Sequence, residues 1–171
     1  MVNTELIILG MISYQPSHGY LLKKNVSDCF GNPYFKLNNN VLYSTLAKLE
    51  KNGFIIGKEM PNEKINKKVY HITEEGKKHL VDLVSTPVKP GTDDFSFLVQ
   101  TAFMDIITPE KRIKVVKPLY ESKMILYQEV LEKKEKNASN MLPVSRIALD
   151  YGIKELENAL EFYEKLMNRE K

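Results

Sequence analysis

Residues 38–55 read NNNVLYSTLAKLEKNGFI, and the spacing of the leucines in this stretch predicts a helix. Its three leucines are four and then three residues apart, which places them on one helical face. The asparagines that begin with Asn38 can cap the first turn, and Gly53 suits the position just beyond a helix end. We therefore expect a helix over residues 40–52 that buries its leucines and leaves a polar face free.

Two shorter helices are predicted before this stretch. Residues 6–12 are almost wholly apolar, and Asn3 can cap the helix that they form. A proline then breaks this helix, and Ser17 can cap a second one that starts at His18. The second helix is expected to end near Gly31, where Gly, Asn and Pro follow one another.

A hairpin and a further helix are predicted after it. Residues 55–60 and 68–72 are short strand candidates separated by a polar turn at 61–67, and Thr73 can cap the helix that follows. Three helices, a two-stranded wing and a helix form the layout of a winged helix-turn-helix. In that fold one amphipathic helix buries its apolar face and offers its polar face to the major groove of DNA.

The polar face of the central helix and the turn of the hairpin supply candidate DNA contacts. Asn, Ser and Thr side chains can bond base edges or phosphates, whereas Lys side chains mainly attract phosphates. The residues predicted to bind DNA on these grounds are Asn39, Asn40, Ser44, Thr45, Lys48, Lys64, Lys67 and Lys68.

Three blocks of this half carry a family resemblance. Residues 18–20 read HGY, residues 42–55 read LYSTLAKLEKNGFI, and residues 69–76 read VYHITEEG. In this order and spacing they resemble the motifs of PadR-type transcriptional regulators. The resemblance implies a dimeric DNA-binding regulator, usually a repressor, whose helical carboxy-terminal domain mediates dimerisation. It also suggests that Tyr43 contacts a phosphate, the alternative being that this ring packs beside its neighbours; Ser44 departs from the proline that is usual there.

The charge of the chain is unevenly spread. The 171 residues have a formal net charge of +3. Residues 1–90 contain 12 lysines and 8 acidic residues, whereas residues 91–171 contain 13 basic and 14 acidic residues. The positive excess therefore belongs to the half with the winged-helix pattern, as expected of a module that binds a polyanion.

The stretch TPVKPG at residues 86–91 is the predicted linker between two domains. Residues 1–86 are the expected winged helix-turn-helix domain, and residues 92–171 are the expected helical dimerisation domain, so the fold class is mostly α. The second domain is predicted to begin with a short helix near residue 94. A long helix then starts at Pro109, with a kink or restart at Pro118, and a last helix follows residue 143.

Apolar side chains at helical spacing mark one face of each long helix. We expect this face to form the dimer interface through Tyr120, Met124, Tyr127, Leu131, Ile153, Leu156, Leu160 and Tyr163. The aromatic side chains of this half, which also include Phe95, Phe97, Phe103 and Phe162, are an alternative lining for a pocket that takes a small aromatic or hydrophobic effector. Packing in a core or a dimer seam is the other interpretation of the same residues.

No sequence feature indicates an enzyme. The chain has no phosphate-binding glycine loop, no GxSxG and no HExxH, and neither a cofactor nor a metal site is predicted, since the three histidines lack ligand spacing. Cys29 is the single cysteine and is expected to be a buried thiol. One cysteine cannot form an internal disulfide, and a chain without disulfides is typical of the cytoplasm. No apolar run approaches the roughly 20 residues of a membrane helix.

The sequence therefore predicts a transcriptional regulator that acts as a homodimer on a palindromic operator in double-stranded DNA. The resemblance implies that this regulator is a repressor. Its two recognition helices are expected about one DNA turn apart, roughly 34–36 Å. A small molecule acting on the helical half is expected to alter DNA affinity if it binds the two states unequally. The alternative is a protein-interaction module that keeps the winged-helix scaffold without binding an operator.

Overall fold

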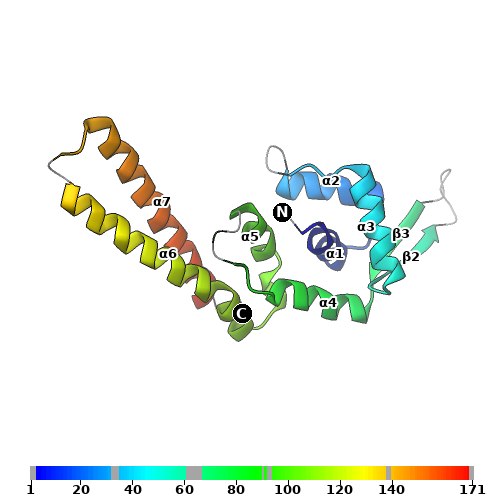
Figure 1. The fold of residues 1–171 in the computed structure, drawn as a ribbon. Coiled ribbons are helices and arrows are strands. Elements are labelled where there is room, and N and C mark those ends of the chain that lie inside the picture. The colour runs from blue at the N-terminus through cyan, green and yellow to red at the C-terminus, as the bar shows by residue number, and fades with distance from the viewer. Residues whose placement is uncertain are drawn as a thin grey trace. The chain divides into compact units, whose positions relative to one another are not determined.

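The computed structural model describes residues 3–31, 35–60, 67–89, 91, 94–137 and 140–169. The chain divides into two compact units, an N-terminal unit of residues 1–86 and 93–106 and a C-terminal unit of residues 87–92 and 107–171. The elements are labelled in Figure 1. The sequence-based boundary assigned everything after residue 92 to the second domain, whereas in the structure residues 93–106 group with the first unit.

Helix α1 (Thr4–Tyr14) forms the centre of the N-terminal unit. Helices α2 (Gly19–Phe30), α3 (Asn39–Lys51) and α4 (Glu74–Ser85) all pack against it (Figure 1). Ile7, Ile8 and Leu9 are completely buried, so α1 is covered on all sides, as a helix that is apolar all round requires. The predicted cap is confirmed, because the Asn3 side chain accepts a hydrogen bond from the Leu6 N–H at 3.1 Å.

The start of α2 differs from the prediction, because the cap is His18 and not Ser17. His18 Nδ1 accepts a hydrogen bond from the Leu21 N–H at 3.2 Å. Ser17 and His18 form the short strand β1, in which His18 pairs with Val69. This pairing holds His18 in the extended conformation that a cap residue needs, so an imidazole nitrogen takes the place of the expected hydroxyl.

The predicted wing strands are confirmed. Strands β2 (Ile55–Met60) and β3 (Lys67–Ile72) pair antiparallel, with Ile55 opposite Ile72 and Met60 opposite Lys67. Strand β1 (Ser17–His18) adds to the other edge of β3, which gives the order β1-β3-β2. The sheet therefore ties the start of α2 to the wing.

The junction between the wing and α4 explains the spacing of Thr73 and Gly76. Thr73 Oγ1 accepts a hydrogen bond from the Gly76 N–H at 3.0 Å and donates one to the Gly53 carbonyl at 2.6 Å. A Cβ atom at Gly76 would clash with the carbonyl oxygen of Phe54. Gly53 itself has a φ of 74°, the left-handed conformation expected just beyond a helix. Both glycines are therefore required by backbone geometry.

Helix α5 (Asp94–Thr101) and the 3₁₀ turn η1 (Met104–Ile106) complete the N-terminal unit. The Gln100 side-chain amide donates to the carbonyls of Val84 and Thr86 at 2.7 and 2.8 Å, which satisfies the end of α4. The Phe103 ring is buried against Gly10 of α1, where a Cβ atom would strike the ring. These contacts are the physical reason that residues 93–106 belong to the first unit.

The C-terminal unit is an antiparallel pair of long helices, α6 (Pro109–Asn137) and α7 (Pro143–Asn168) (Figure 1). Helix α6 runs through Pro118 without a break, so the predicted restart is wrong. Three polar pairs join the helices, at 2.8 Å for Tyr120–Glu164, 2.8 Å for Tyr127–Glu157 and 2.7 Å for Lys134–Asp150. On each helix the residues of successive pairs are seven positions apart, which is about two helical turns. The two helices therefore keep the same register along the whole hairpin.

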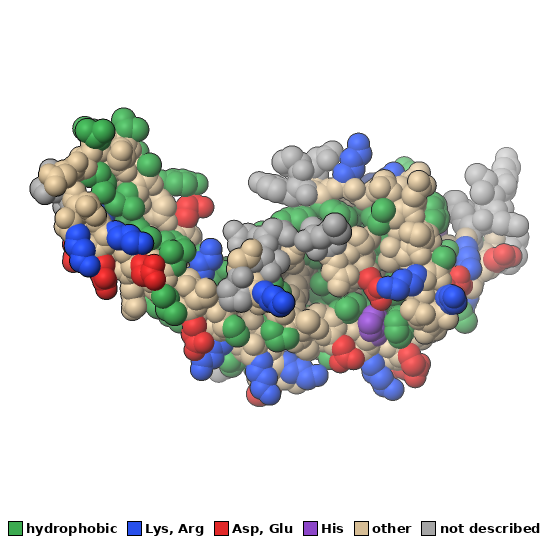
Figure 2. Space-filling view, viewed as in Figure 1, with side chains coloured by type: hydrophobic (Ala, Val, Ile, Leu, Met, Phe, Trp, Pro, Cys, Tyr) green, Lys and Arg blue, Asp and Glu red, His purple; other side chains and the backbone are tan. Residues whose placement is uncertain are grey.

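The residues predicted to form the dimer interface pack within this hairpin. Ile153, Leu160 and Tyr163 are buried, and the other five are partly buried. Other apolar side chains remain exposed on the same unit, and apolar surface is visible at the far end of the hairpin in Figure 2. The exposed large apolar residues described in this unit are Ile113, Ile125, Leu126, Leu142, Val144, Ile147 and Tyr151. The described helices include none that is long and apolar enough to cross a membrane.

Candidate nucleic-acid interface

Helix α3 presents the polar face that the sequence predicts. Leu42, Leu46 and Leu49 are buried against the N-terminal unit, each at most 1% exposed. Asn38 caps the helix, since its side chain accepts a hydrogen bond from the Val41 N–H at 2.8 Å. The helix is therefore held by its leucines and its cap, and its opposite face is left for a partner.

Most of the predicted contact residues on α3 are exposed. Asn39, Asn40, Tyr43, Ser44 and Lys48 are exposed and Thr45 is half-buried. The Ser44 and Thr45 hydroxyls donate to the Val41 carbonyl, at 3.1 and 2.7 Å. A hydroxyl that donates in this way still has lone pairs with which to accept from a base amino group.

A cleft between α2 and α3 adds residues that sequence reasoning missed. It has a volume of about 500 Å³ and its lining includes Tyr20, Lys23 and Lys24 from α2 together with Tyr43 from α3. Tyr20 is 75% exposed and Tyr43 is 54% exposed. The HGY block could have indicated Tyr20. This tyrosine lies two residues after the cap of α2, and it points outward because the helix buries Leu22 and Val26.

The middle residue of the HGY block makes room for Tyr43. A Cβ atom at Gly19 would lie 2.9 Å from both Cε1 and the hydroxyl oxygen of Tyr43. The Tyr43 ring therefore lies against the backbone of α2 while more than half of the residue stays exposed. The ring therefore packs on Gly19, and the contact of Tyr43 with a phosphate stays a prediction.

Asn39 is tied to the opposite wall of this cleft. Lys23 Nζ donates a hydrogen bond to Asn39 Oδ1 at 2.7 Å. Because this bond uses the side-chain oxygen of Asn39, the side-chain NH2 group can still donate to a ligand. The cleft thus combines two lysines, two tyrosine hydroxyls and an amide donor, all of which can bond phosphate oxygens, and Asp28 is the one carboxylate in its lining.

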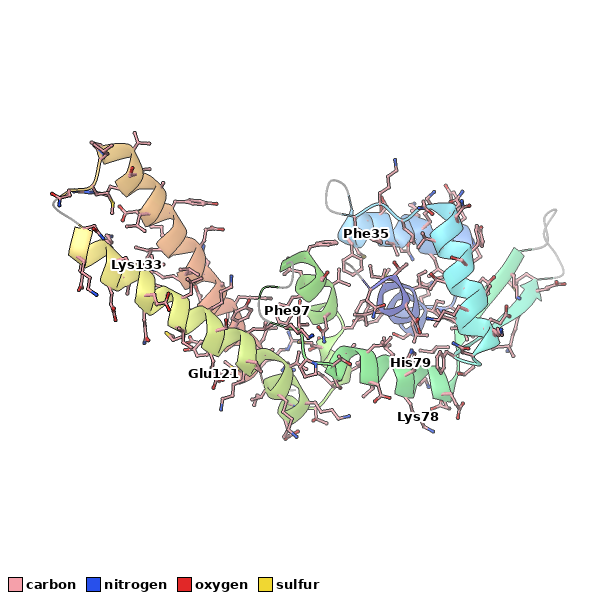
Figure 3. All side chains as sticks on the ribbon, viewed as in Figure 1. Phe35, Lys78, His79, Phe97, Glu121 and Lys133 are labelled. Atoms are coloured by element: carbon pink, nitrogen blue, oxygen red, sulfur yellow. The ribbon has the colours of Figure 1, made fainter. Side chains whose placement is uncertain are left out.

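Lys48 is less free than the sequence suggests. Its ammonium group lies 2.7 Å from Glu5 Oε2, and the other oxygen of Glu5 lies 2.8 Å from His79 Nε2. Figure 3 labels His79 on α4, where its ring stacks on Phe54 at a centroid distance of 4.1 Å. Burial raises the pKa of Glu5, but hydrogen bonds and charges from Lys48 and His79 outweigh it and leave the pKa below the ordinary value of 4.5. Glu5 therefore links α1, α3 and α4.

Lys68 on the wing is also paired. Its ammonium group lies 2.7 Å from Glu50 Oε2, and Glu50 Oε1 accepts a hydrogen bond from the Gly57 N–H at 3.1 Å. The hydrogen bond from Lys68 lowers the pKa of Glu50, and the same bond raises the pKa of Lys68. Of the other wing lysines, Lys64 lies outside the described residues, and only the backbone of Lys67 is described.

Two further sequence-based expectations bear on sites. Cys29 is exposed, so the prediction of a buried thiol is wrong; it follows the buried Leu22 and Val26 at helical spacing, but it lies in the last turn of α2, which has no buried residue. Within the described ranges, no three His, Cys, Asp or Glu side chains are grouped so that they could hold a metal ion.

Comparison with known proteins gives a family for the N-terminal half. Residues 8–82 match the model of the transcriptional regulator PadR-like family, and this range includes most of α1, the α2–α3 cleft, the wing and most of α4. No curated protein sequence matches the chain.

Several solved structures are similar to this chain. The crystal structure of Bacillus subtilis PadR in complex with operator DNA is 19% identical, with 95% of this chain and 96% of that chain covered and a TM-score of 0.45. A transcriptional regulator from Clostridium thermocellum is 31% identical over 47% of this chain and 77% of that one, with a TM-score of 0.44. The PadR-like transcriptional regulator BC1756 from Bacillus cereus is 26% identical, with 96% of each chain covered and a TM-score of 0.43.

Proposed function

We propose that this chain, whose residues 8–82 match the PadR-like family of transcriptional regulators, binds operator DNA and represses transcription as a homodimer. The observation that carries the proposal is the exposed polar surface shared by α2 and α3. It combines the outward face of α3 with the tyrosines and lysines of the cleft. A protein bound to an operator excludes other proteins from the same DNA, and this exclusion accounts for repression.

In this proposal α3 enters the major groove. Asn40, Ser44 and Thr45 lie on its exposed or half-exposed side and are the residues proposed to bond base edges. Tyr20, Lys23, Lys24 and Tyr43 are proposed to bond the phosphates that flank the groove. The wing lysines Lys64, Lys67 and Lys68 are proposed to add attraction to the backbone.

The exposed apolar residues of the C-terminal hairpin support the homodimer. Of the eight residues first expected at the interface, three are buried in the hairpin and five are partly buried, so the proposed contact adds the exposed apolar residues to those five. Val144, Ile147 and Tyr151 lie three and four residues apart on α7, which makes them neighbours on one face, and all three are more than 60% exposed. Exposed apolar clusters of this kind mark interaction sites, and a second copy of the chain would cover them.

The test is the salt dependence of DNA binding. A fluorescent duplex selected by this protein from a random-sequence library would be titrated at several salt concentrations, with anisotropy as the readout. Replacing Lys23 and Lys24 by alanine should weaken binding and reduce the slope of log affinity against log salt by about two per protomer. The matched control replaces Lys77 and Lys78 of α4, where Figure 3 labels Lys78, and should leave the slope unchanged.

Two results would overturn the proposal. One is the absence of DNA binding even at low salt, which favours the protein-interaction alternative. The other is an equal change of slope in both double variants, because the α2–α3 cleft would then have no special part in binding.

A further inference from the structure

In the described part of the chain, a third strand joins the wing strands β2 and β3 along part of their length. Strand β1 pairs with β3 at Val69 and Tyr70. Beyond these residues the described pairs, beginning with Glu59 and Lys68, join β2 and β3 alone. A two-stranded hairpin is marginally stable by itself. The outer part of the wing, which is the part proposed to reach DNA, therefore needs another contact that fixes its position relative to α3.

Glu50, in the last turn of α3, contacts both strands of the wing, which lies beside α3 in Figure 1. Its Oε1 accepts a hydrogen bond from the Gly57 N–H of β2 at 3.1 Å, and its Oε2 lies 2.7 Å from Lys68 Nζ of β3. The Thr73 N–H donates to the Phe54 carbonyl, and because bonded pairs alternate along antiparallel strands, the Gly57 N–H points away from β3. Glu50 thus bonds a donor on the outer edge of β2 and pairs at the same time with a lysine of β3.

The absence of a side chain at Gly57 lets Lys68 reach Glu50. A Cβ atom at Gly57 would clash with Cε of Lys68 and would lie 2.9 Å from Glu50 Oε1, so the lysine side chain crosses directly over this glycine. The Lys68 ammonium group also lies 5.5 Å from the ring centre of the buried Tyr70, within the range of a cation–π contact. The glycine, the lysine and the glutamate therefore form one set of contacts that joins α3, β2 and β3.

We propose that Glu50 is a positioning residue for DNA binding, which fixes the wing relative to α3 so that both contact the operator in one geometry. The inference rests on the proposed function, since that function assigns α3 and the wing to DNA. Base contacts of α3 hold the protein in one register on a matching site, and a wing of fixed position meets the backbone there. Random DNA is held through its phosphates in many registers, so its binding depends little on the position of the wing.

Glu50→Gln separates position from charge, because the two predict opposite changes. Loss of the carboxylate frees the Lys68 ammonium group, which raises the attraction for any DNA. Loss of the wing position weakens binding of the selected duplex alone. We therefore expect the ratio of the affinity for the selected duplex to that for a random duplex to fall about two- to fivefold, the range expected for an ion pair whose side chains are 41% and 32% exposed.

Conservative and control variants isolate the pair. Lys68→Arg keeps a cation opposite Glu50 and should keep the ratio of affinities, whereas Lys68→Met should lower it as Glu50→Gln does. Glu75→Gln on α4 is the matched control, because it removes the same charge from an ion pair with Lys78, at 3.9 Å, that lies within one helix. It should leave the ratio unchanged. A merely structural role of Glu50 would reduce the amount of active protein and lower both affinities equally, so an unchanged ratio in Glu50→Gln, or an equal fall in Glu75→Gln, would overturn the proposal.

Hydrogen exchange at the Gly57 amide tests the contact without DNA. Glu50→Ala removes the acceptor of this N–H, so its exchange should become about three- to tenfold faster, whereas Glu75→Ala should not change it. A wild-type exchange rate in Glu50→Ala would show that Glu50 does not hold β2 and would overturn the proposal. Failure of the wild-type protein to bind either duplex would instead contradict the proposed function, and the exchange rate would still decide whether Glu50 fixes the wing.

Discussion

The ring of Tyr43 lies against the backbone of Gly19, so close that a Cβ atom there would be 2.9 Å from the ring. This contact joins the first residue of α2 to the exposed side of α3, and both residues line the cleft proposed to hold phosphate. The absence of a side chain at residue 19 thus sets the position of an aromatic residue on the proposed DNA-binding face.

Gly19→Ala should therefore weaken DNA binding with little loss of stability. The added methyl group pushes the end of the Tyr43 ring, which can move because it is exposed. Alanine also favours the helix by about 0.5–1 kcal/mol relative to glycine, which offsets part of the strain. DNA affinity by anisotropy and urea unfolding would be compared in the same preparation. A large loss of stability, or an unchanged affinity, would contradict this view of Gly19.

Gly76→Ala should instead destabilise the protein, by about 1–3 kcal/mol or more. Its Cβ atom would meet the Phe54 carbonyl, which is backbone and cannot rotate away. Gly152→Ala in α7 is the matched control, because nothing lies within 4 Å of its Cβ position, and it should be neutral or stabilising by up to about 1 kcal/mol. Urea midpoints measure both changes. Equal midpoints for the two variants would show that the Thr73–Gly76 junction tolerates a side chain.

The carboxylate of Glu5 should contribute to acid sensitivity. Its pKa in the folded protein lies below the ordinary 4.5, so its contribution to the free energy of unfolding is present above about pH 4.5 and is lost as the pH falls through the folded pKa. Glu5→Gln should be less stable than the wild type at pH 7, and the difference should shrink toward pH 3. Urea unfolding at both pH values tests this, and a constant difference would rule out the ionised carboxylate as the cause.

The same substitution should strengthen non-specific DNA binding. Lys48 is paired with Glu5 and is 63% exposed, so removal of the negative charge releases an ammonium group on the DNA-facing helix. We expect the salt slope of Glu5→Gln to rise by up to about one per protomer. In Glu5→Gln combined with Lys48→Gln the slope should return to the wild-type value. A slope that stays high in the double variant would assign the effect to a movement of α3 instead.

Ile147→Lys combined with Tyr151→Lys should convert the proposed dimer to a monomer. Both side chains are exposed on α7 and lie one turn apart, so two charges there oppose any apolar contact between copies. Sedimentation at micromolar concentration measures the mass. Ile147→Leu combined with Tyr151→Phe keeps both positions apolar and should stay dimeric. A lysine variant that sediments as a dimer would exclude this face.

Much of the N-terminal fold follows from local sequence patterns. The leucine spacing of α3, the cap at Thr73 and the two wing strands could be predicted because each depends on residues that are close together in the chain. The cap of α2 could not, since His18 acts as a cap because strand pairing with Val69 holds it extended. The exposure of Cys29 was missed for a similar reason, because spacing puts it on the same face as Leu22 and Val26, and only tertiary packing decides that the buried part of α2 ends at Val26.

The candidate site was predictable in outline only. Sequence spacing identified the exposed residues of α3, but Tyr20, Lys23 and Lys24 become part of the site through the crossing of α2 and α3. Spacing likewise found the apolar faces of α6 and α7 without indicating that these faces pack on each other. That arrangement depends on a register fixed by pairs such as Tyr127 and Glu157, thirty residues apart.

The sequence by itself determined the order of helices and strands, the inward face of α3 and the family of the N-terminal half, because these depend on short-range spacing. Only the tertiary structure decided which charges are free. Lys48 and Lys68 are each 2.7 Å from a carboxylate, and Glu5 reaches Lys48 across 43 positions of the chain. Ion pairing depends on distance in space, and packing of α1 against α3 sets that distance here.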